Sequence, residues 1–165
     1  SIGSAGHLCT AKLEQAAGIN LRVVPDKGTA PAFQDLIGGQ IEGFIDPVLG
    51  SVQFHRNQQL KVLAVTSPQR LPNLPDVATA ADTLPGFECA SWYGLWAPAK
   101  TAPERVQWLN AEVNKALTAP AVVEAFAKGG IASLSGTPAQ FADFIRTETA
   151  RYAEVIKRAN ISAES

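Results

Sequence analysis

Two short loops carry the residues best suited to bind an anion, because each combines small side chains with a hydroxyl just before a helix-forming segment. The residues are Ser4, Ala5, Gly6 and His7 in the first loop and Gly28, Thr29 and Ala30 in the second. The first amides of a helix have no partner within it and carry the positive end of its dipole. We therefore predict that both loops present backbone N–H groups to an anion.

Asp46 is the acidic candidate for the same site. It ends an apolar segment and precedes Pro47, which is typical of an N-cap residue followed by proline at the first helical position. Its carboxylate would also lie at the carboxyl end of a strand, where ligands of open α/β sheets bind. There it could hold ordered water or a donor group of a ligand. The two interpretations are compatible, and both are retained.

A hydrolase built on Ser4 and His7 is the third-ranked possibility. These residues lie on the same predicted first turn, where Ser4 is the natural N-cap of a helix that Gly18 ends. No acid is placed to orient either His7 or His55. The loop Gly3-Ser4-Ala5-Gly6 lacks the Gly-x-Ser-x-Gly pattern of a nucleophile elbow. It also fails the phosphate-loop and dinucleotide patterns. We predict a binding protein without a cofactor rather than an enzyme.

The two cysteines, Cys9 and Cys89, have no second Cys or His at metal-ligand spacing, so no metal site is predicted. Cys9 falls on a predicted helix and Cys89 in a predicted strand. Free cysteine is commonly a small buried apolar residue, but the sequence leaves open whether these two form a disulfide.

Composition narrows the class of partner. The chain has 165 residues, with 14 Lys and Arg against 15 Asp and Glu, so it lacks the basic face that nucleic-acid binding needs. No apolar run approaches the roughly 18 residues of a membrane span, and no charged-then-apolar leader opens the chain. We expect a soluble chain, mature or truncated.

The predicted fold class is α/β, organised around the segment from Val23 to Asp46. That segment has the order of a βαβ unit: apolar strand, glycine turn, helix opened by Thr29 and Pro31, Gly-Gly stop, and a second apolar strand. A further long apolar strand follows at 60–66 and suits the middle of a parallel sheet. The predicted strands are 19–24, the segment ending at Asp46, 60–66, 87–97 and, more weakly, 131–134.

The carboxyl-terminal part is predicted to be mainly helical. Thr101 with Glu104, and Thr137 with Gln140, have the spacing of capping boxes. The second of these boxes opens a long amphipathic helix, in which Glu148 is assigned to the outer, charged face. Between the two parts, residues 67–86 contain four prolines and are interpreted as a crossover.

Several stretches in order along nearly the whole chain resemble the Bug family, the periplasmic substrate-binding proteins of tripartite tricarboxylate transporters. They are Val-Pro-Asp-Lys-Gly-Thr-Ala-Pro-Ala-Phe-Gln-Asp-Leu-Ile-Gly-Gly-Gln (24–40), Leu-Lys-Val-Leu-Ala-Val-Thr-Ser (60–67), Arg-Leu-Pro-Asn-Leu-Pro-Asp-Val (70–77), Leu-Pro-Gly-Phe-Glu (84–88), Ser-Trp-Tyr-Gly-Leu-Trp-Ala-Pro-Ala (91–99) and Gly-Thr-Pro-Ala-Gln-Phe (136–141).

The resemblance implies a two-lobed clamshell of the periplasmic-binding-protein (type II) class that captures a small mono- or dicarboxylate and presents it to membrane transporter subunits. Residues 1–66 would form the family's second lobe, 67–84 a crossover linker, and 85–165 the carboxyl-terminal helices and strand of the other, incomplete lobe. The family's amino-terminal segment, with its own ligand loop, is not matched by this chain. The implied location is periplasmic.

The resemblance also assigns the ligand residues. The loop containing Ser4 to His7 matches one family ligand loop, and Lys27-Gly28-Thr29-Ala30 matches the next. Asp46 matches an acid that the family uses toward the ligand through water. The alternative function is a binding lobe that acts as a sensor or self-associating interaction module through surface left uncovered.

Overall fold

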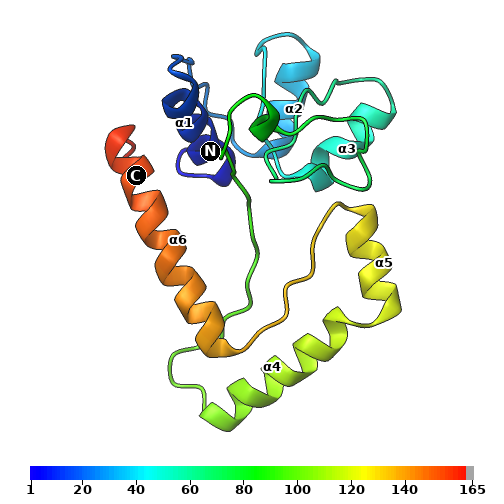
Figure 1. Cartoon of the computed structure of the whole chain (residues 1–165), viewed down its shortest axis with the longest axis vertical. Helices are drawn as coiled ribbons and strands as arrows, with labels where there is room; N and C mark the ends of the chain where they lie inside the picture. Colours follow the sequence, from blue (N-terminus) through cyan, green and yellow to red (C-terminus); the bar gives the residue numbers. More distant parts are fainter. Residues whose placement is uncertain (163–165) are drawn as a thin grey trace.

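The computed structural model describes residues 1–162, and these form a largely helical structure. The elements are α1 (Ala5–Ala17), α2 (Thr29–Ile37), α3 (Val48–Arg56), the 3-10 helix η1 (Ala80–Asp82), α4 (Pro103–Leu117), α5 (Pro120–Lys128) and α6 (Pro138–Arg158). Helices α1, α2 and α3 gather at one end of the molecule, α4 lies at the other, and α5 leads from α4 back towards α3 (Figure 1). Helix α6 runs from the α4 end back to α1, against which it packs (Figure 1).

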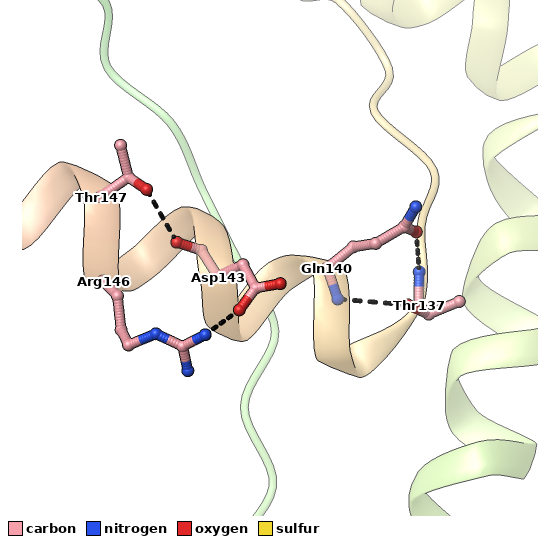
Figure 2. A network of polar contacts seen from close by, with 5 residues as sticks. All are labelled: Thr137, Gln140, Asp143, Arg146 and Thr147. Atoms are coloured by element: carbon pink, nitrogen blue, oxygen red, sulfur yellow. Dashed lines mark hydrogen bonds and ion pairs between the residues drawn. The ribbon is translucent and has the colours of Figure 1, made fainter.

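Two of the predicted helix caps are confirmed. The Ser4 hydroxyl accepts a hydrogen bond from the His7 amide at 3.3 Å at the start of α1. Thr137 and Gln140 form a reciprocal capping box at the start of α6, with N–H to side-chain oxygen distances of 2.9 and 3.2 Å (Figure 2). One turn later, Asp143 pairs with Arg146, and its carbonyl accepts from the Thr147 hydroxyl (Figure 2). Local sequence therefore defines the start of α6.

Two other predicted caps are wrong. Helix α3 has Pro47 at the N-cap position and no capping side chain, so Asp46 lies one residue too early to cap it. Helix α4 has Ala102 at the N-cap, with Pro103 at the first position, and Thr101 makes no side-chain capping bond. In both cases the proline adjoins the helix start, which shifts the cap away from the polar residue.

The predicted strands do not form among residues 1–162, where the β-type pairing is confined to a parallel bridge between Val65 and Thr79. The Val65 amide donates to Ala78 O at 2.9 Å, and the Ala80 amide donates to Val65 O at 2.8 Å. A strand needs a continued ladder of such bonds, whereas the one further backbone bond between predicted strands in the described part runs from the Cys89 amide to Thr66 O at 3.0 Å. The sheet of the expected lobe is therefore not seen, and Ile19, Val24 and Leu63 are 47%, 50% and 78% exposed.

Two buried apolar clusters hold the amino-terminal part together. The first joins α3 to the crossover through Val52, Val65, Leu74 and Val77. The second joins α1 to the segment after η1 through Cys9, Phe87 and Cys89. These clusters fix α1 and α3 relative to the long connection that follows α3.

Helix α6 contacts both ends of the molecule. Near its start, Phe141 and Phe144 pack against Trp92 and Trp96, with the Trp92 and Phe144 ring centroids 5.2 Å apart. Near its end, Val155 is buried and its carbonyl accepts from Gln15 Nε2 of α1 at 3.5 Å. Among residues 1–162, no helix has the length and apolar character needed to cross a membrane.

Glu148 of α6 is buried, which corrects its predicted place on the outer face. Its carboxylate pairs with Arg151 Nη1 at 3.2 Å, and its side chain retains 10% exposure. The charge periodicity of α6 marks Glu148 as outward, but the neighbouring elements cover that position. The sequence pattern of one helix does not show which of its positions other elements cover.

Candidate functional site

The predicted ligand loops converge on one short backbone segment, Ile45-Asp46. A Cβ atom added to Gly6 would lie 2.3 Å from Ile45 O, so the first turn of α1 rests directly on this segment. The Thr29 hydroxyl, in the first turn of α2, donates to Asp46 Oδ1 at 3.4 Å. The start of α1 therefore packs on Ile45, and the start of α2 contacts the next residue, Asp46.

The first loop presents two backbone donors. The His7 amide is used by the Ser4 cap, and the Leu8 amide donates to Ser4 O at 2.9 Å. Within the described part of the chain, no acceptor is found for the amides of Ala5 and Gly6, which are at the positive end of the α1 dipole. These two N–H groups are suited to bind an anion.

The His7 imidazole is held by the same loop. Its Nδ1 accepts from the Gly3 amide at 3.0 Å, so in this arrangement the ring proton is on Nε2. Nδ1 is therefore occupied and cannot take a proton from Ser4, whose hydroxyl oxygen caps α1. The geometry gives Ser4 and His7 structural roles and leaves His7 Nε2–H as a donor.

The second loop depends on glycine. Gly28 has φ of 116°, a backbone angle that residues other than glycine rarely adopt. It is the N-cap of α2 and provides no side-chain hydrogen bond. The amides of Thr29 and Ala30 therefore begin the helix without a capping acceptor among the described residues, and Pro31 has no N–H to satisfy. Thr29 and Ala30 are both exposed.

Asp46 combines partial burial with a single hydrogen bond. Burial raises the pKa of its carboxyl above the ordinary value, and the hydrogen bond from Thr29 lowers it by a smaller amount. Its Oδ2 lies 2.9 Å from the place that a Cβ of Gly50 would occupy. The absence of a side chain at Gly50 therefore leaves room for the carboxylate beside the first turn of α3.

The raised pKa gives a testable dependence of stability on pH. Folded Asp46 holds its proton more tightly than the unfolded chain does, so the free energy of unfolding falls as pH rises from 3.8 through the raised pKa. We expect Asp46→Asn to be more stable than the unmodified chain at pH 7 and to lose that advantage below pH 3.8. Thermal unfolding at both pH values measures this. If Asp46→Asn is more stable than the unmodified chain by the same amount at both pH values, ionisation of Asp46 does not cause the difference in stability.

Of the residues predicted for the site, the structure brings Thr29 to Asp46 and packs Gly6 on the neighbouring Ile45. Two surface hollows were found elsewhere: one is lined by Pro98, Lys100, Thr101, Ala102, Glu104 and Arg105, and the other by His55, Arg56, Gln58, Asn73, Leu74, Pro75, Asp76 and Val77. Neither includes a predicted ligand residue. The predicted ligand residues therefore lie outside both hollows.

Sequence reasoning missed Ile45 and Gly50, which position the site without offering it a functional group. Two glycines within helices, Gly6 in α1 and Gly50 in α3, were the available signals of close packing here. Glycine destabilises a helix, so its presence within one often has a packing reason. Among residues 1–162, no group of three or more His, Cys, Asp and Glu side chains is arranged to hold a metal ion.

Comparison with protein families gives one match over nearly the whole chain. The family described as the tripartite tricarboxylate transporter family receptor matches residues 1–161. A protein encoded in the tcbD-tcbE intergenic region of a Pseudomonas species is 40% identical over 164 residues, covering 98% of this chain and 49% of that protein. BugT of Bordetella pertussis is 35% identical over 158 residues, covering 95% of this chain and 48% of BugT.

Solved structures agree with these sequence matches. A Rhodopseudomonas palustris protein with adipate has a TM-score of 0.90 at 33% identity, over 97% of this chain and 54% of that one. MatC from the same organism, with bound malate, has a TM-score of 0.79 at 31% identity, over 93% of this chain and 54% of MatC. This chain thus spans about half the length of the relatives described.

Proposed function

We propose that this chain, which belongs to the tripartite tricarboxylate transporter receptor family, supplies one wall of a site that captures a small carboxylate outside the cytoplasm. The captured solute would be passed unchanged to membrane subunits of a transporter. In this proposal residues 1–66 carry the ligand wall, 67–84 form the linker, and 85–165 belong to the opposite lobe.

The observation that carries the proposal is that two helix starts pack on adjacent residues, Ile45 and Asp46. The amides of Ala5 and Gly6, which have no acceptor among residues 1–162, belong to the helix start at Ile45, and Thr29 and Ala30 belong to the helix start at Asp46. The positive end of a helix dipole lies at its first turn, so both helix starts favour a negative charge nearby. The adipate and malate bound by two structural relatives are dicarboxylates, which supports a carboxylate as the anion.

The proposed role of Asp46 differs from that of the two helix starts. A carboxylate cannot donate to an anionic ligand, and its charge repels one. We therefore assign Asp46 to an ordered water, which it would hold as acceptor while the water donates to the ligand. The Thr29 hydroxyl is 3.4 Å from Asp46 Oδ1, a long hydrogen bond. It is free to rotate toward a bound carboxylate.

Substitution at Thr29 tests this arrangement. Thr29→Val removes the hydroxyl with little change in shape and is expected to weaken malate or adipate binding about 5- to 10-fold, the effect of one hydrogen bond. Calorimetric titration measures the change. Thr118→Val is the matched control, because the Thr118 hydroxyl donates to Lys115 O within its own helix end, at the end of α4. Equal affinity in Thr29→Val and Thr118→Val would contradict the assignment of Thr29.

Asp46→Ala separates the role of water from that of charge. Loss of the negative charge alone would strengthen binding of an anion, whereas loss of the ordered water would weaken it. We expect weaker binding, by about 10-fold. Unchanged or stronger binding would exclude Asp46 as the residue that holds the water.

A second candidate function, a self-associating interaction module, is favoured by exposed apolar side chains. On the extended segments they include Ile19, Leu21, Val23, Val24, Leu63, Tyr93, Leu95 and Trp96, which range from 42% to 83% exposure. Apolar surface on unpaired extended segments favours association. Sedimentation over a concentration series should then show dimers or larger species, and a monomer at high concentration would count against this module.

A further inference from the structure

Two cysteines that are distant in sequence lie in the same buried cluster. Cys9 is 3% exposed on the second turn of α1, and Cys89 is 7% exposed in the extended segment after η1. Both belong to the apolar cluster that contains Phe87 and is bordered by Leu13 and Ile45. Both are free thiols in this structure, and each is the largest influence on the pKa of the other.

Both cysteines are fixed by interactions on their own side of the contact. The Cys89 amide donates to Thr66 O at 3.0 Å, and its carbonyl accepts from the Thr66 hydroxyl at 2.7 Å. On the α1 side, Lys12 Nζ lies 5.7 Å from the centroid of the Phe87 ring and donates to Glu88 O. The fold therefore maintains the contact between the thiols from two directions.

The surroundings distinguish the two thiols chemically. A hydrogen bond from Cys9 is the largest influence on Cys89 and lowers its pKa to about 7, with smaller lowering effects from Tyr152 and Lys12. Burial and the Glu148 carboxylate act in the opposite direction. The same hydrogen bond, together with burial, raises the pKa of Cys9 above its usual range. Cys89 is thus the thiolate-forming member and Cys9 the proton donor.

We propose that Cys9 and Cys89 form a dithiol site that closes to an intramolecular disulfide and ties α1 to the segment 87–90. The oxidant is a disulfide, either a small-molecule disulfide or that of a thiol-disulfide oxidoreductase. Cys89 thiolate attacks one sulfur of the oxidant, giving a mixed disulfide and releasing a thiolate. Cys9 then attacks Cys89 Sγ and releases the second thiol. The proton from Cys9 goes to the leaving thiolate, so two protein thiols are oxidised and one disulfide is reduced to two thiols.

The disulfide would act on the helix that carries the first ligand loop. Cys9 lies one turn after Ser4 to His7 on α1, and Cys89 follows the crossover. Oxidation would therefore join the proposed ligand wall covalently to the chain that leads to the other helices. The inference is independent of the proposed function, because its test requires no ligand.

The test is oxidation of the reduced chain by oxidised glutathione under native conditions, followed by proteolytic peptide mapping without reductant. The expected product is a peptide pair linked through Cys9 and Cys89, with loss of both free thiols. Glutathione on either cysteine as the final product, links between molecules, or persistence of both thiols would overturn the proposal.

Single variants and unfolded chain provide the controls. Cys9→Ser and Cys89→Ser should each accumulate a glutathione adduct or keep one free thiol, with folding checked by circular dichroism. The equilibrium constant for closing the disulfide should be at least about 10-fold larger in the folded chain than in urea, because the fold holds the thiols together. Equal constants would show that the fold does not favour closure, and would overturn the proposal even if the serine variants fail to fold.

Oxidation should also stabilise the chain. A disulfide that closes a long loop restricts the unfolded state, so the oxidised chain is expected to have a Tm about 5–10 °C higher than the reduced chain. An oxidised chain with an unchanged or lower Tm would show that the native geometry of the pair does not accommodate the bond.

Discussion

Gly6→Ala is expected to lower the free energy of unfolding by about 1–3 kcal/mol, the usual cost of forcing extra atoms into a packed site. The added Cβ would lie 2.3 Å from Ile45 O, which is backbone and cannot move aside cheaply. Alanine is favoured over glycine in a helix by up to about 1 kcal/mol, so the steric cost exceeds the propensity gain. We also expect carboxylate affinity to fall at least about 10-fold, since misplacement by about 1 Å is costly at a preorganised site.

Gly43→Ala is the matched control for this substitution. Gly43 lies two residues before Ile45, and a Cβ added to it would have no heavy atom within 4 Å. Its backbone is outside the positive-φ region, so the same change should be neutral or raise stability by up to about 1 kcal/mol. Chemical denaturation of both variants gives the two free energies of unfolding to compare. Equal stability of Gly6→Ala and Gly43→Ala would contradict the close approach of α1 to Ile45.

Phe33→Ala is expected to cost about 3–5 kcal/mol of stability, which corresponds to a Tm lower by about 6–20 °C. Phe33 is 5% exposed on α2, and its ring centroid lies 4.5 Å from that of Phe54 and 5.4 Å from that of Phe44. It therefore joins α2 both to α3 and to the segment that ends at Asp46. Removing the ring leaves a cavity among all three.

The control for Phe33 is an exposed aromatic of similar size. Trp108 on α4 is 63% exposed, and its replacement by alanine should change the free energy of unfolding by less than about 0.5 kcal/mol. Calorimetric melting of the two variants gives the comparison. Equal Tm values for Phe33→Ala and Trp108→Ala would show that the aromatic cluster does not hold the site together.

Much of the helical structure could be predicted because its signals are local. Ser4 and Thr137 have the residue types and spacing of caps, and both accept the expected backbone hydrogen bonds. Gly18 ends α1 in the left-handed conformation with φ of 65°, as its position predicts. These features require only neighbours within one or two turns.

The errors arise where a second element decides the outcome. Asp46 has the sequence of a cap, yet its carboxylate accepts from Thr29 on another helix. Apolar segments such as 60–66 match strands, but a ladder depends on a partner that the pattern cannot supply, and in the described residues the β-bridge of this segment is limited to Val65. The contact between Cys9 and Cys89 likewise depends on how α1 meets the crossover, so their spacing alone left the pairing open.

The carboxylate site is tested most directly by nuclear magnetic resonance titration of the isotopically labelled chain with malate and with adipate. Amide resonances of Ala5, Gly6, Thr29 and Ala30 should shift together and saturate with one dissociation constant. The corresponding diamides, which carry no charge, should leave these resonances unchanged. Shifts that are absent, or that fall instead on the hollow lined by Lys100 and Arg105, would contradict the proposed site.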